Sequence, residues 1–241
     1  MANLVVDIGN TALKAAWADG MTLGKTFRYQ GERTLDFILS LTERQKPETM
    51  VVSTVRPLSE RDIHFLEREC DRFVVIDSAH REAVAGYGFP SYLSSDRVAC
   101  LMAAGYLFRE KPCTVFDFGT MLTVDFMDAG GHYSGGNISP GCRTRFKSIN
   151  RYSKMLPLIN TPDVVEDAGT SVAGSIGAGV IRGIMFEIDG YICQYPENIV
   201  VFTGGDAIYF AKRMKNSIFV VCNLVLIGLA LIADENDKRI Y

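Results

Sequence analysis

Leu4-Val-Val-Asp-Ile-Gly-Asn-Thr11 is the stretch of sequence that decides the fold. Three apolar residues lead into an aspartate, a glycine and two small polar residues, a pattern typical of a buried strand that ends in a tight turn. The pattern recurs at Val115-Phe-Asp-Phe-Gly-Thr120, where Asp117 corresponds to Asp7 at an offset of 110 positions in a chain of 241. An offset so close to half the length indicates two similar halves.

Each of these turns is followed by two further strand-like segments, which are separated by a glycine-containing turn. The segments span residues 12–17 and 21–27 in the first half and 121–127 and 132–138 in the second. Each half is therefore predicted to open with a three-stranded meander. We expect the two halves to present their Asp-x-Gly turns to each other across a cleft.

The residue types in the turns suit a nucleotide. Glycine lets the backbone approach a phosphate closely, and the polar groups of Asn10, Thr11 and Thr120 can donate to phosphate oxygens. A carboxylate such as Asp7 or Asp117 can hold hydrated Mg²⁺, which takes one or two carboxylates besides the phosphates of a substrate. A single Asp-x-Gly sequence is more often only the turn of a β-hairpin, without a binding role. Two copies at equivalent positions favour the nucleotide interpretation.

Composition and charge exclude several classes of protein. The chain is 48% apolar and 22% charged, with a net charge of −3, which argues against bulk binding to nucleic acid or acidic membranes. Its six cysteines form no Cys-x-x-Cys pair, a pattern typical of reduced cysteines in a cytoplasmic protein. The apolar run Ile218–Ala233 has 16 residues, whereas a membrane-spanning helix needs about 20.

The rest of the pattern predicts an α/β protein of two lobes, residues 1–111 and 112–241, with the boundary near Lys111-Pro112. Helices alternate with strands in the first lobe, and a Gly- and aromatic-rich loop over 85–93 leads into a helix that begins near Ser94 or Ser95. The expected helices lie at 32–46, 59–70, 94–110, 172–193 and from 224, and the further strands at 50–55, 73–77, 113–118, 199–202 and 218–222.

The helix predicted over 172–193 contains glycine at 174, 177, 179 and 183. Glycine weakens a helix intrinsically but permits very close packing against another backbone. A packed dimer interface and a flexible hinge are both compatible with this composition, and the interface is favoured.

Five motifs, read in order over nearly the whole chain, resemble those of type III pantothenate kinases. They are Asp7-x-Gly-Asn-Thr11, Ser95-Asp-Arg97, Asp117-x-Gly-Thr120, Gly135-Gly-x-Ile-x-Pro-Gly141 and Thr203-Gly-Gly205. The resemblance implies two ribonuclease-H-like lobes, each a mixed sheet with flanking helices, in the actin-like ATPase fold of the acetate and sugar kinase/Hsp70/actin superfamily. It also implies ATP-dependent phosphorylation of pantothenate to 4'-phosphopantothenate, the first step of coenzyme A biosynthesis. The implied enzyme is a cytoplasmic homodimer that uses Mg²⁺ and a monovalent cation, K⁺ or NH₄⁺.

The resemblance assigns roles to residues at matching positions. Asp96 matches a catalytic base, Asp117 a ligand of the monovalent cation, and Asp7 a candidate ligand of Mg²⁺. ATP would contact the first turn, the second turn and an adenosine motif, through Asp7, Ile8, Gly9, Asn10, Thr11, Ala12, Leu13, Lys14, Thr120, Gly204 and Gly205. Pantothenate would contact Tyr87, Ser94, Ser95, Asp96 and Arg97, together with Thr170 from the other subunit.

Three positions depart from the family pattern. Ser94 stands where the family usually has glycine, Met121 where it has alanine, and Gly169 where it has asparagine. None of these positions carries a group assigned to the chemistry, so the kinase interpretation is kept.

Other interpretations remain open. Ser94-Ser-Asp-Arg97 alone is typical of a capped helix start with a surface ion pair. The chain could be a nucleotide-binding regulatory relative of the kinases, or a superfamily kinase for another small hydroxy substrate. It lacks the large insertions with which relatives build filament contacts or a peptide-binding domain. The three histidines, His64, His80 and His132, show no metal-ligand spacing.

Overall fold

The computed structural model describes residues 2–238, which form two compact units. The first unit contains the chain up to Leu107 together with the residues from Asn223 onward, and the second runs from Phe108 to Cys222. The expected lobes, 1–111 and 112–241, differ from these units in two ways. The boundary lies slightly earlier, and the last helix returns to the first unit, because its apolar residues pack against the first sheet.

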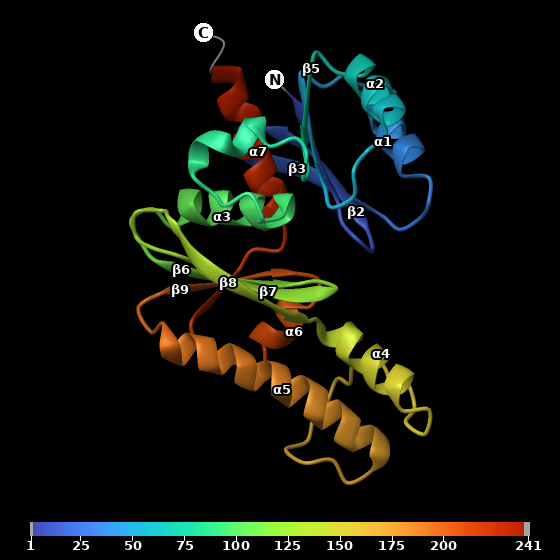
Figure 1. Cartoon of the computed structure of the whole chain (residues 1–241), viewed down its shortest axis with the longest axis vertical. Helices are drawn as coiled ribbons and strands as arrows, with labels where there is room; N and C mark the ends of the chain where they lie inside the picture. Colours follow the sequence, from blue (N-terminus) through green and yellow to red (C-terminus); the bar gives the residue numbers. More distant parts are fainter. Residues whose placement is uncertain (1, 239–241) are drawn as a thin grey trace. The chain divides into compact units, whose positions relative to one another are not determined.

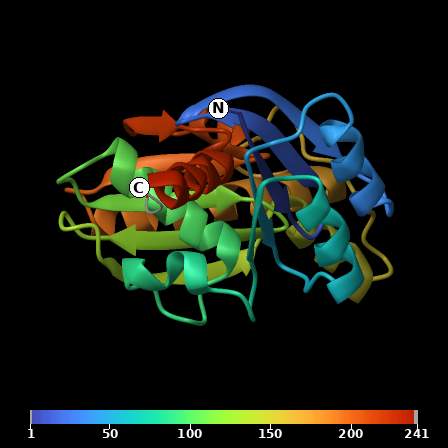
Figure 2. The same cartoon turned by 90° about the horizontal axis from the view of Figure 1, so that it is seen from above.

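The first unit is a five-stranded sheet in the order β3-β2-β1-β4-β5, with β1 antiparallel to β2 and parallel to β4. Helices α1 and α2 cover one face, whereas α3 and α7 lie side by side on the other (Figures 1 and 2). The elements are β1 (Asn3–Ile8), β2 (Leu13–Asp19), β3 (Thr22–Tyr29), α1 (Thr34–Thr42), β4 (Thr49–Thr54), α2 (Glu60–Arg68), β5 (Arg72–Ile76), the 3₁₀ helix η1 (Glu82–Tyr87), α3 (Ser95–Leu107) and α7 (Leu224–Lys238).

The second unit repeats this topology, since its sheet has the order β10-β9-β6-β7-β8 and β6 takes the place of β1. Strand β6 is antiparallel to β7 and parallel to β9, as β1 is to β2 and β4. The elements are β6 (Cys113–Phe118), β7 (Met121–Met127), β8 (Tyr133–Pro140), α4 (Cys142–Tyr152), α5 (Val172–Gln194), β9 (Ile199–Gly204), α6 (Ala207–Ala211) and β10 (Ile218–Val220). The predicted duplication of a mixed sheet with flanking helices is confirmed.

Burial explains why the central strands read as continuous apolar runs. Leu4, Val5 and Val6 of β1 are all fully buried, because helices cover both faces of the first sheet. The core of the second unit is aromatic: Phe118 packs against Phe202 of β9 and against Phe210 of α6. Each Asp-x-Gly turn therefore starts from a strand held rigidly in a core.

The expected strands and long helices lie within a few residues of the observed ones, but two helices are missing from the prediction. The basic stretch around Arg143 and Lys147 forms α4, and residues 207–211 form the short α6. Only Cys142 and Phe146 of α4 are buried, so its apolar pattern is too sparse to indicate a helix. Part of the expected loop 85–93 belongs to η1.

The apolar segment near the C-terminus lies mostly in α7, a helix of 15 residues. Among the described residues, no helix is both long enough and apolar enough to span a bilayer. Four cysteines are buried (70, 100, 113 and 142), and burial raises the pKa of the Cys70 and Cys113 thiols to about 11. Cys193 and Cys222 are exposed, and all six are free thiols.

Helices α3 and α7 approach each other very closely at Gly228 of α7. A Cβ atom added to Gly228 would lie 1.9 Å from the carbonyl oxygen of Ala99 in α3. Real Cβ atoms do not come so close to another backbone, so Gly228 allows these two helices to pack. This contact explains a glycine inside an otherwise apolar helix.

We expect Gly228→Ala to lower the free energy of unfolding by about 1–3 kcal/mol, because the methyl group must push the two helices apart. On helix propensity alone the same change would raise stability by about 1 kcal/mol. The sign of the effect in thermal or urea unfolding therefore tests the contact.

Candidate active site

The first Asp-x-Gly turn joins β1 to β2. The backbone N–H of Gly9 donates to the carbonyl of Ala12 at 3.1 Å and closes the turn, which leaves Asn10 and Thr11 exposed at its tip. Asp7, at the end of β1, has Lys14 as its antiparallel partner in the register and Ser53 as its parallel partner. The turn therefore presents polar groups beyond the end of a rigid strand.

A cavity of about 400 Å³ lies beside this turn. It is lined by residues 8–13, by the chain from the end of β3 into α1, by the segment after β4 and by α2. Two guanidinium groups border the cavity, those of Arg33 and Arg56, of which Arg33 is paired with Asp36 at 2.6 Å. Arg56 is a basic residue close to the turn that the sequence pattern does not single out.

A chain of hydroxyl groups connects the end of β1 to the start of α3. Ser53 Oγ, on β4, lies 3.4 Å from Asp7 Oδ1 and 2.9 Å from Ser95 Oγ. Ser95 Oγ also donates to the carbonyl of Thr54 at 3.3 Å. Asp7 is only 9% exposed and both serines are buried, so these contacts offset the cost of removing polar groups from water. They fix where α3 begins.

Asp96 and Arg97 lie in the first turn of α3. Asp96 is partly exposed, and its Oδ1 accepts a hydrogen bond from the backbone N–H of Arg97 at 2.9 Å. Arg97 itself is 7% exposed. The positive end of the helix dipole favours a carboxylate at Asp96. Ser94, where the family pattern has glycine, does not need glycine's freedom, because Glu110 is the only non-glycine with positive φ in the described part of the chain.

Tyr87 ends η1, in the segment that precedes α3. Its ring stacks on Phe89 with the ring centroids 6.5 Å apart, and the Tyr87 side chain is partly buried. Tyr87 belongs to the same unit as Asp96.

The second Asp-x-Gly turn joins β6 to β7 and is held from two sides. The backbone N–H of Gly119 donates to the carbonyl of Met121 at 3.0 Å. The carbonyl of Thr120 accepts two hydrogen bonds, from the N–H of Gly141 at 3.1 Å and from Thr144 Oγ1 at 2.6 Å. Thr120 and Met121 are both exposed, so the larger side chain of Met121 is accommodated without crowding the turn.

Asp117 and the glycines of Thr203-Gly-Gly205 meet at the ends of β6 and β9. Gly204 has φ +90°, and an added Cβ would lie 2.4 Å from Asp117 Oδ1 and 2.6 Å from the backbone of Phe118. The N–H of Gly205 donates to the carbonyl of Phe118 at 2.9 Å. Glycine is therefore required at position 204 by both conformation and space. Burial raises the pKa of the adjacent Asp206.

The chemistry of these carboxylates fits hard cations. Mg²⁺ and K⁺ prefer oxygen ligands, and Asp7 and Asp117 each provide a carboxylate at the end of a central strand. The missing Cβ of Gly204 leaves room at Asp117 Oδ1. No cluster of three or more His, Cys, Asp or Glu side chains capable of holding a metal occurs among the side chains that the structure describes, those of residues 2–234. Most ligands of either cation would come from the nucleotide and water.

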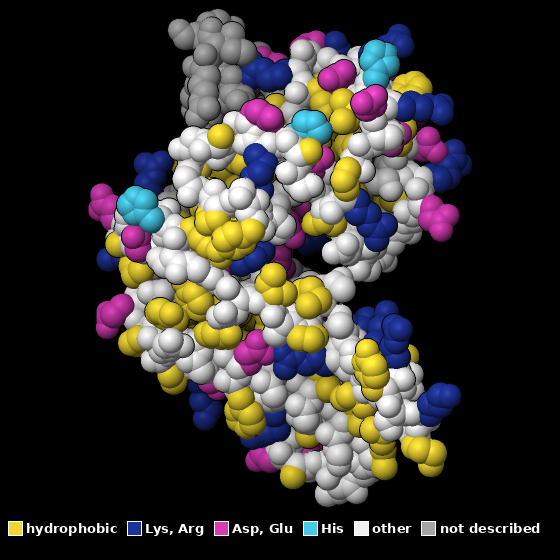
Figure 3. Space-filling model, in the orientation of Figure 1, with side chains coloured by type: hydrophobic (Ala, Val, Ile, Leu, Met, Phe, Trp, Pro, Cys, Tyr) yellow, Lys and Arg dark blue, Asp and Glu magenta, His cyan; other side chains and the backbone are white. Residues whose placement is uncertain are grey.

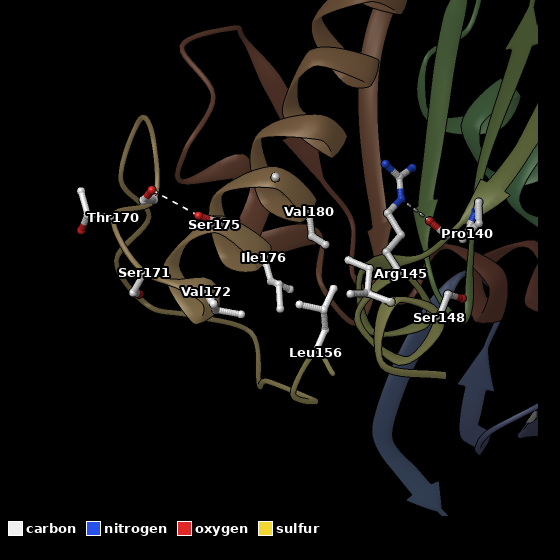
Figure 4. Close-up of a pocket in the computed structure, with 13 residues that line it drawn as sticks. Pro140, Arg145, Ser148, Leu156, Thr170, Ser171, Val172, Ser175, Ile176 and Val180 are labelled. Atoms are coloured by element: carbon white, nitrogen blue, oxygen red, sulfur yellow. Dashed lines mark hydrogen bonds between the residues drawn. The ribbon is translucent and has the colours of Figure 1, made fainter. Parts of the chain in front are cut away.

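Thr170 lies on the exposed loop before α5. That loop borders a cavity of about 1060 Å³ between α4 and α5. Leu156, Ile176 and Val180 project toward one another inside it, whereas Thr170 lies at its rim (Figure 4). Gly169 cannot be replaced by the family's asparagine without movement, because an added Cβ would lie 2.1 Å from the N atom of Ser175.

An ion pair fixes α5 relative to α4 and β8. Arg145 binds Glu187 of α5, and its Nε donates to the carbonyl of Pro140 at 2.8 Å. Ser139 Oγ donates to Glu187 at 2.7 Å. Large hydrophobic side chains nevertheless remain exposed over α4 and the segment after it (Figure 3), notably Met155 at 91% and Tyr152 at 86%.

The structure thus brings together some of the expected residues and adds others. Asp7 and Ser95 are linked through Ser53 in the first unit, with Asp96 next in sequence, and Asp117 and Gly204 lie against each other in the second. Sequence reasoning missed the residues that support them, Ser53 and Thr144. Ser53 could have been found from the sequence. Ser53-Thr54 is a polar pair at the end of the apolar run 50–52, and Ser53 is the parallel-strand partner of Asp7.

Solved structures with the same fold are distant in sequence. A protein from Campylobacter jejuni described as a conserved putative Baf family transcriptional activator superposes with a TM-score of 0.65 at 21% identity, covering 98% of this chain and 99% of that one. The activator of 2-hydroxyisocaproyl-CoA dehydratase from Clostridium difficile, with bound ADPNP, gives 0.60 at 15% identity and covers 99% and 96%. Together with a ParM protein at 0.54, they establish the actin-like ATPase fold.

Closer relatives are found by sequence. The chain is 40% identical to the type III pantothenate kinase of Phocaeicola vulgatus, over 98% of this chain and 99% of that protein. It is 36% identical to the type III pantothenate kinase of Bacteroides fragilis, over 99% and 100%. The model of the family described as type III pantothenate kinase matches residues 3–194. The chain therefore belongs to the type III pantothenate kinase family, ATP-dependent phosphotransferases that phosphorylate pantothenate in coenzyme A biosynthesis.

Proposed function

We propose that the two Asp-x-Gly turns bind the phosphates of ATP and that the start of α3 binds pantothenate, so that the chain forms 4'-phosphopantothenate. The observation that carries this division of roles is the repetition of one turn at the same position of two sheets with the same strand order. Phosphoryl transfer depends mainly on positioning and on neutralising charge, which rigid turns at strand ends can provide.

The first turn would bind phosphate through the backbone and side chains of residues 8–14. Asn10 and Thr11 are exposed at its tip, and Arg56 borders the adjoining cavity. Asp7 would hold Mg²⁺, which when bound neutralises charge on the phosphate oxygens. The buried hydroxyl of Ser53 orients the Asp7 carboxylate for that contact.

The second unit would bind the remaining parts of the nucleotide. Thr120 can donate its hydroxyl to a phosphate, and the backbone at Gly204 and Gly205 can approach adenosine closely because no side chain intervenes. Asp117 would hold the monovalent cation, which when bound adds positive charge beside the phosphates. Two hydrogen bonds on the carbonyl of Thr120 keep the turn in place.

Pantothenate would lie against the start of α3. The guanidinium of Arg97 is always charged and forked, a good partner for the carboxylate of pantothenate. Asp96, partly exposed one residue earlier, would accept the proton of the hydroxyl group as its oxygen attacks the γ-phosphorus of ATP. Tyr87, Ser94 and Ser95 would complete the substrate contacts.

We expect the purified protein to release ADP when given Mg²⁺, ATP and pantothenate, and Asp96→Asn to lower turnover by about 100-fold or more, the usual effect of losing a positioned base. The asparagine keeps an oxygen for the N–H of Arg97, so folding and ATP binding should persist. A coupled ADP-release assay measures turnover, and calorimetry measures ATP binding.

Asp71→Asn, which removes an exposed carboxylate in the same unit, is the matched control and should retain activity. ADP release with another alcohol but not with pantothenate would contradict the substrate assignment. ATP binding without ADP release from any alcohol would favour a regulatory relative. Near-normal turnover of Asp96→Asn would make Asp96 only a helix-start residue.

Activity should depend on K⁺ or NH₄⁺, and Asp117→Asn should weaken that dependence. ATP brings several negative charges to a chain whose own net charge is −3, so a bound cation lowers the repulsion. Initial rates measured across a K⁺ titration, with Na⁺ holding the ionic strength constant, test this. Asp128→Asn, on an exposed turn of the same unit, should leave the K⁺ dependence unchanged. Equal rates in Na⁺ and K⁺ would contradict the cation role.

We further propose that the active form is a homodimer, with Thr170 of each subunit completing the pantothenate site of the other. Two observations support a second copy over α4 and α5: the large apolar cavity between these helices and the exposed hydrophobic side chains beside it. An added Cβ at Gly179 meets nothing within 4 Å, so the glycine face of α5 is open to a close helix contact from another chain.

Mixing two inactive variants tests the shared site. In a mixed dimer of Asp96→Asn and Thr170→Trp subunits, one of the two sites has an intact Asp96 and receives an intact Thr170. Random pairing makes half of the dimers mixed, each with one working site, so activity should return to about a quarter of the wild-type value. Mixed dimers that form but stay inactive, or an active monomer by light scattering, would contradict the model.

A further inference from the structure

The segment between β5 and α3 carries Tyr87 and leads to Asp96, yet η1 is its only regular structure. Its start is fixed by Asp77, whose Oδ1 accepts hydrogen bonds from the backbone N–H groups of Ala79 at 2.7 Å and His80 at 2.8 Å. Burial by itself would raise the pKa of Asp77, but these bonds hold it below its ordinary value. The segment therefore leaves β5 in a defined direction.

Arg81 joins this start to the end of the segment. Its Nη1 donates to the carbonyl of Leu93 at 2.7 Å, and its Nη2 lies 3.3 Å from the carbonyl of Pro90. The N–H of Leu93 also donates to the carbonyl of Pro90, at 3.1 Å, so the three groups form one closed arrangement. A guanidinium can reach two carbonyls at once because its donors form a rigid fork.

Arg81 could either add stability in general or fix the path of the chain, and the position of its hydrogen bonds favours the second role. The bonds close a loop of residues 81–93 that contains Tyr87 and ends three residues before Asp96. Leu93 is 1% exposed, so its carbonyl is held firmly and the guanidinium is anchored against the core. A hydrogen bond that only added stability could lie in any loop. The bonds of Arg81 fix the path of the chain around Tyr87 and before Asp96, the two residues proposed to meet the substrate.

We propose that Arg81 is a positioning residue for pantothenate, one that holds the 81–93 loop so that Tyr87 and Asp96 face the same substrate. The inference rests on the proposed roles of those two residues. The guanidinium of Arg81 donates to the carbonyls of Leu93 and Pro90, not to the first Asp-x-Gly turn. Loss of the Arg81 side chain should therefore weaken pantothenate binding and leave ATP binding unchanged.

The test compares Arg81→Met and Arg81→Lys with the wild type in the ADP-release assay. We expect Arg81→Met to raise the KM for pantothenate about tenfold or more, since small displacements of positioning groups cost up to about 100-fold in rate. The KM for ATP should stay within about twofold. Arg81→Lys should be intermediate, because an ammonium can donate to one carbonyl but lacks the planar fork.

Hydrogen exchange provides a second measurement that does not need activity. In Arg81→Met the amides of residues 82–94 should exchange faster, while those of α2 should keep the wild-type rate. Arg68→Met, an exposed arginine at the end of α2, is the matched control and should change neither the exchange of 82–94 nor either KM. If Arg81→Met does not fold, Arg81→Lys supplies both readouts.

The outcomes separate this inference from the proposed function. Unchanged exchange over 82–94, or an equal rise of both KM values in a folded variant, would overturn the positioning role. A wild type without pantothenate-dependent ADP release would overturn the substrate assignment, and with it the role of Arg81. Faster exchange together with a selective rise of the pantothenate KM would support it.

Discussion

A buried carboxylate at the end of β1 is the constraint on which the first unit depends. Asp7 is almost fully enclosed, and removing such a charge from water is costly unless hydrogen bonds replace those to solvent. The hydroxyl of Ser53 lies beside it, and Ser95 lies beside Ser53. Satisfying one carboxylate thus ties β1, β4 and the first residue of α3 together. The partly exposed Asp96 follows directly, so its place is set by the same contacts.

In the second unit the Asp-x-Gly turn is held by close backbone packing and not by a buried polar network. Strand β9 runs beside β6, and Gly204 passes so close to Asp117 and Phe118 that no side chain fits. The carbonyl of Thr120 is held by Gly141 and Thr144, at the junction of β8 and α4. One turn is stabilised by a buried polar network and the other by close backbone packing. In both turns the polar residues at the tip are exposed.

The surface between α4 and α5 is apolar and exposed, unlike the surroundings of the two turns. Arg145, Ser139 and Glu187 fix the two helices to the end of β8, yet the space between them remains open and apolar, with large hydrophobic side chains exposed nearby. Exposed apolar surface of this extent costs free energy in water, which is why we assign it to contact with a second copy. On this proposal Gly179 of α5, where an added Cβ meets nothing within 4 Å, would serve close approach by the second copy.

The sequence by itself determined the duplicated fold, because the Asp-x-Gly turns and apolar runs record local geometry: buried strands need apolar residues, and tight turns need glycine. It also determined that a helix begins near residue 59, where Ser59 Oγ caps α2 by accepting from the N–H of Asp62, a contact only three residues away. Only the tertiary structure decided that α7 returns to the first unit, that Ser53 supports Asp7, and that Arg81 closes the loop before α3. These facts depend on groups 12 to 46 positions apart, or on the packing of α7 against strands from the start of the chain. Contacts between such distant groups leave no periodic trace in a single sequence.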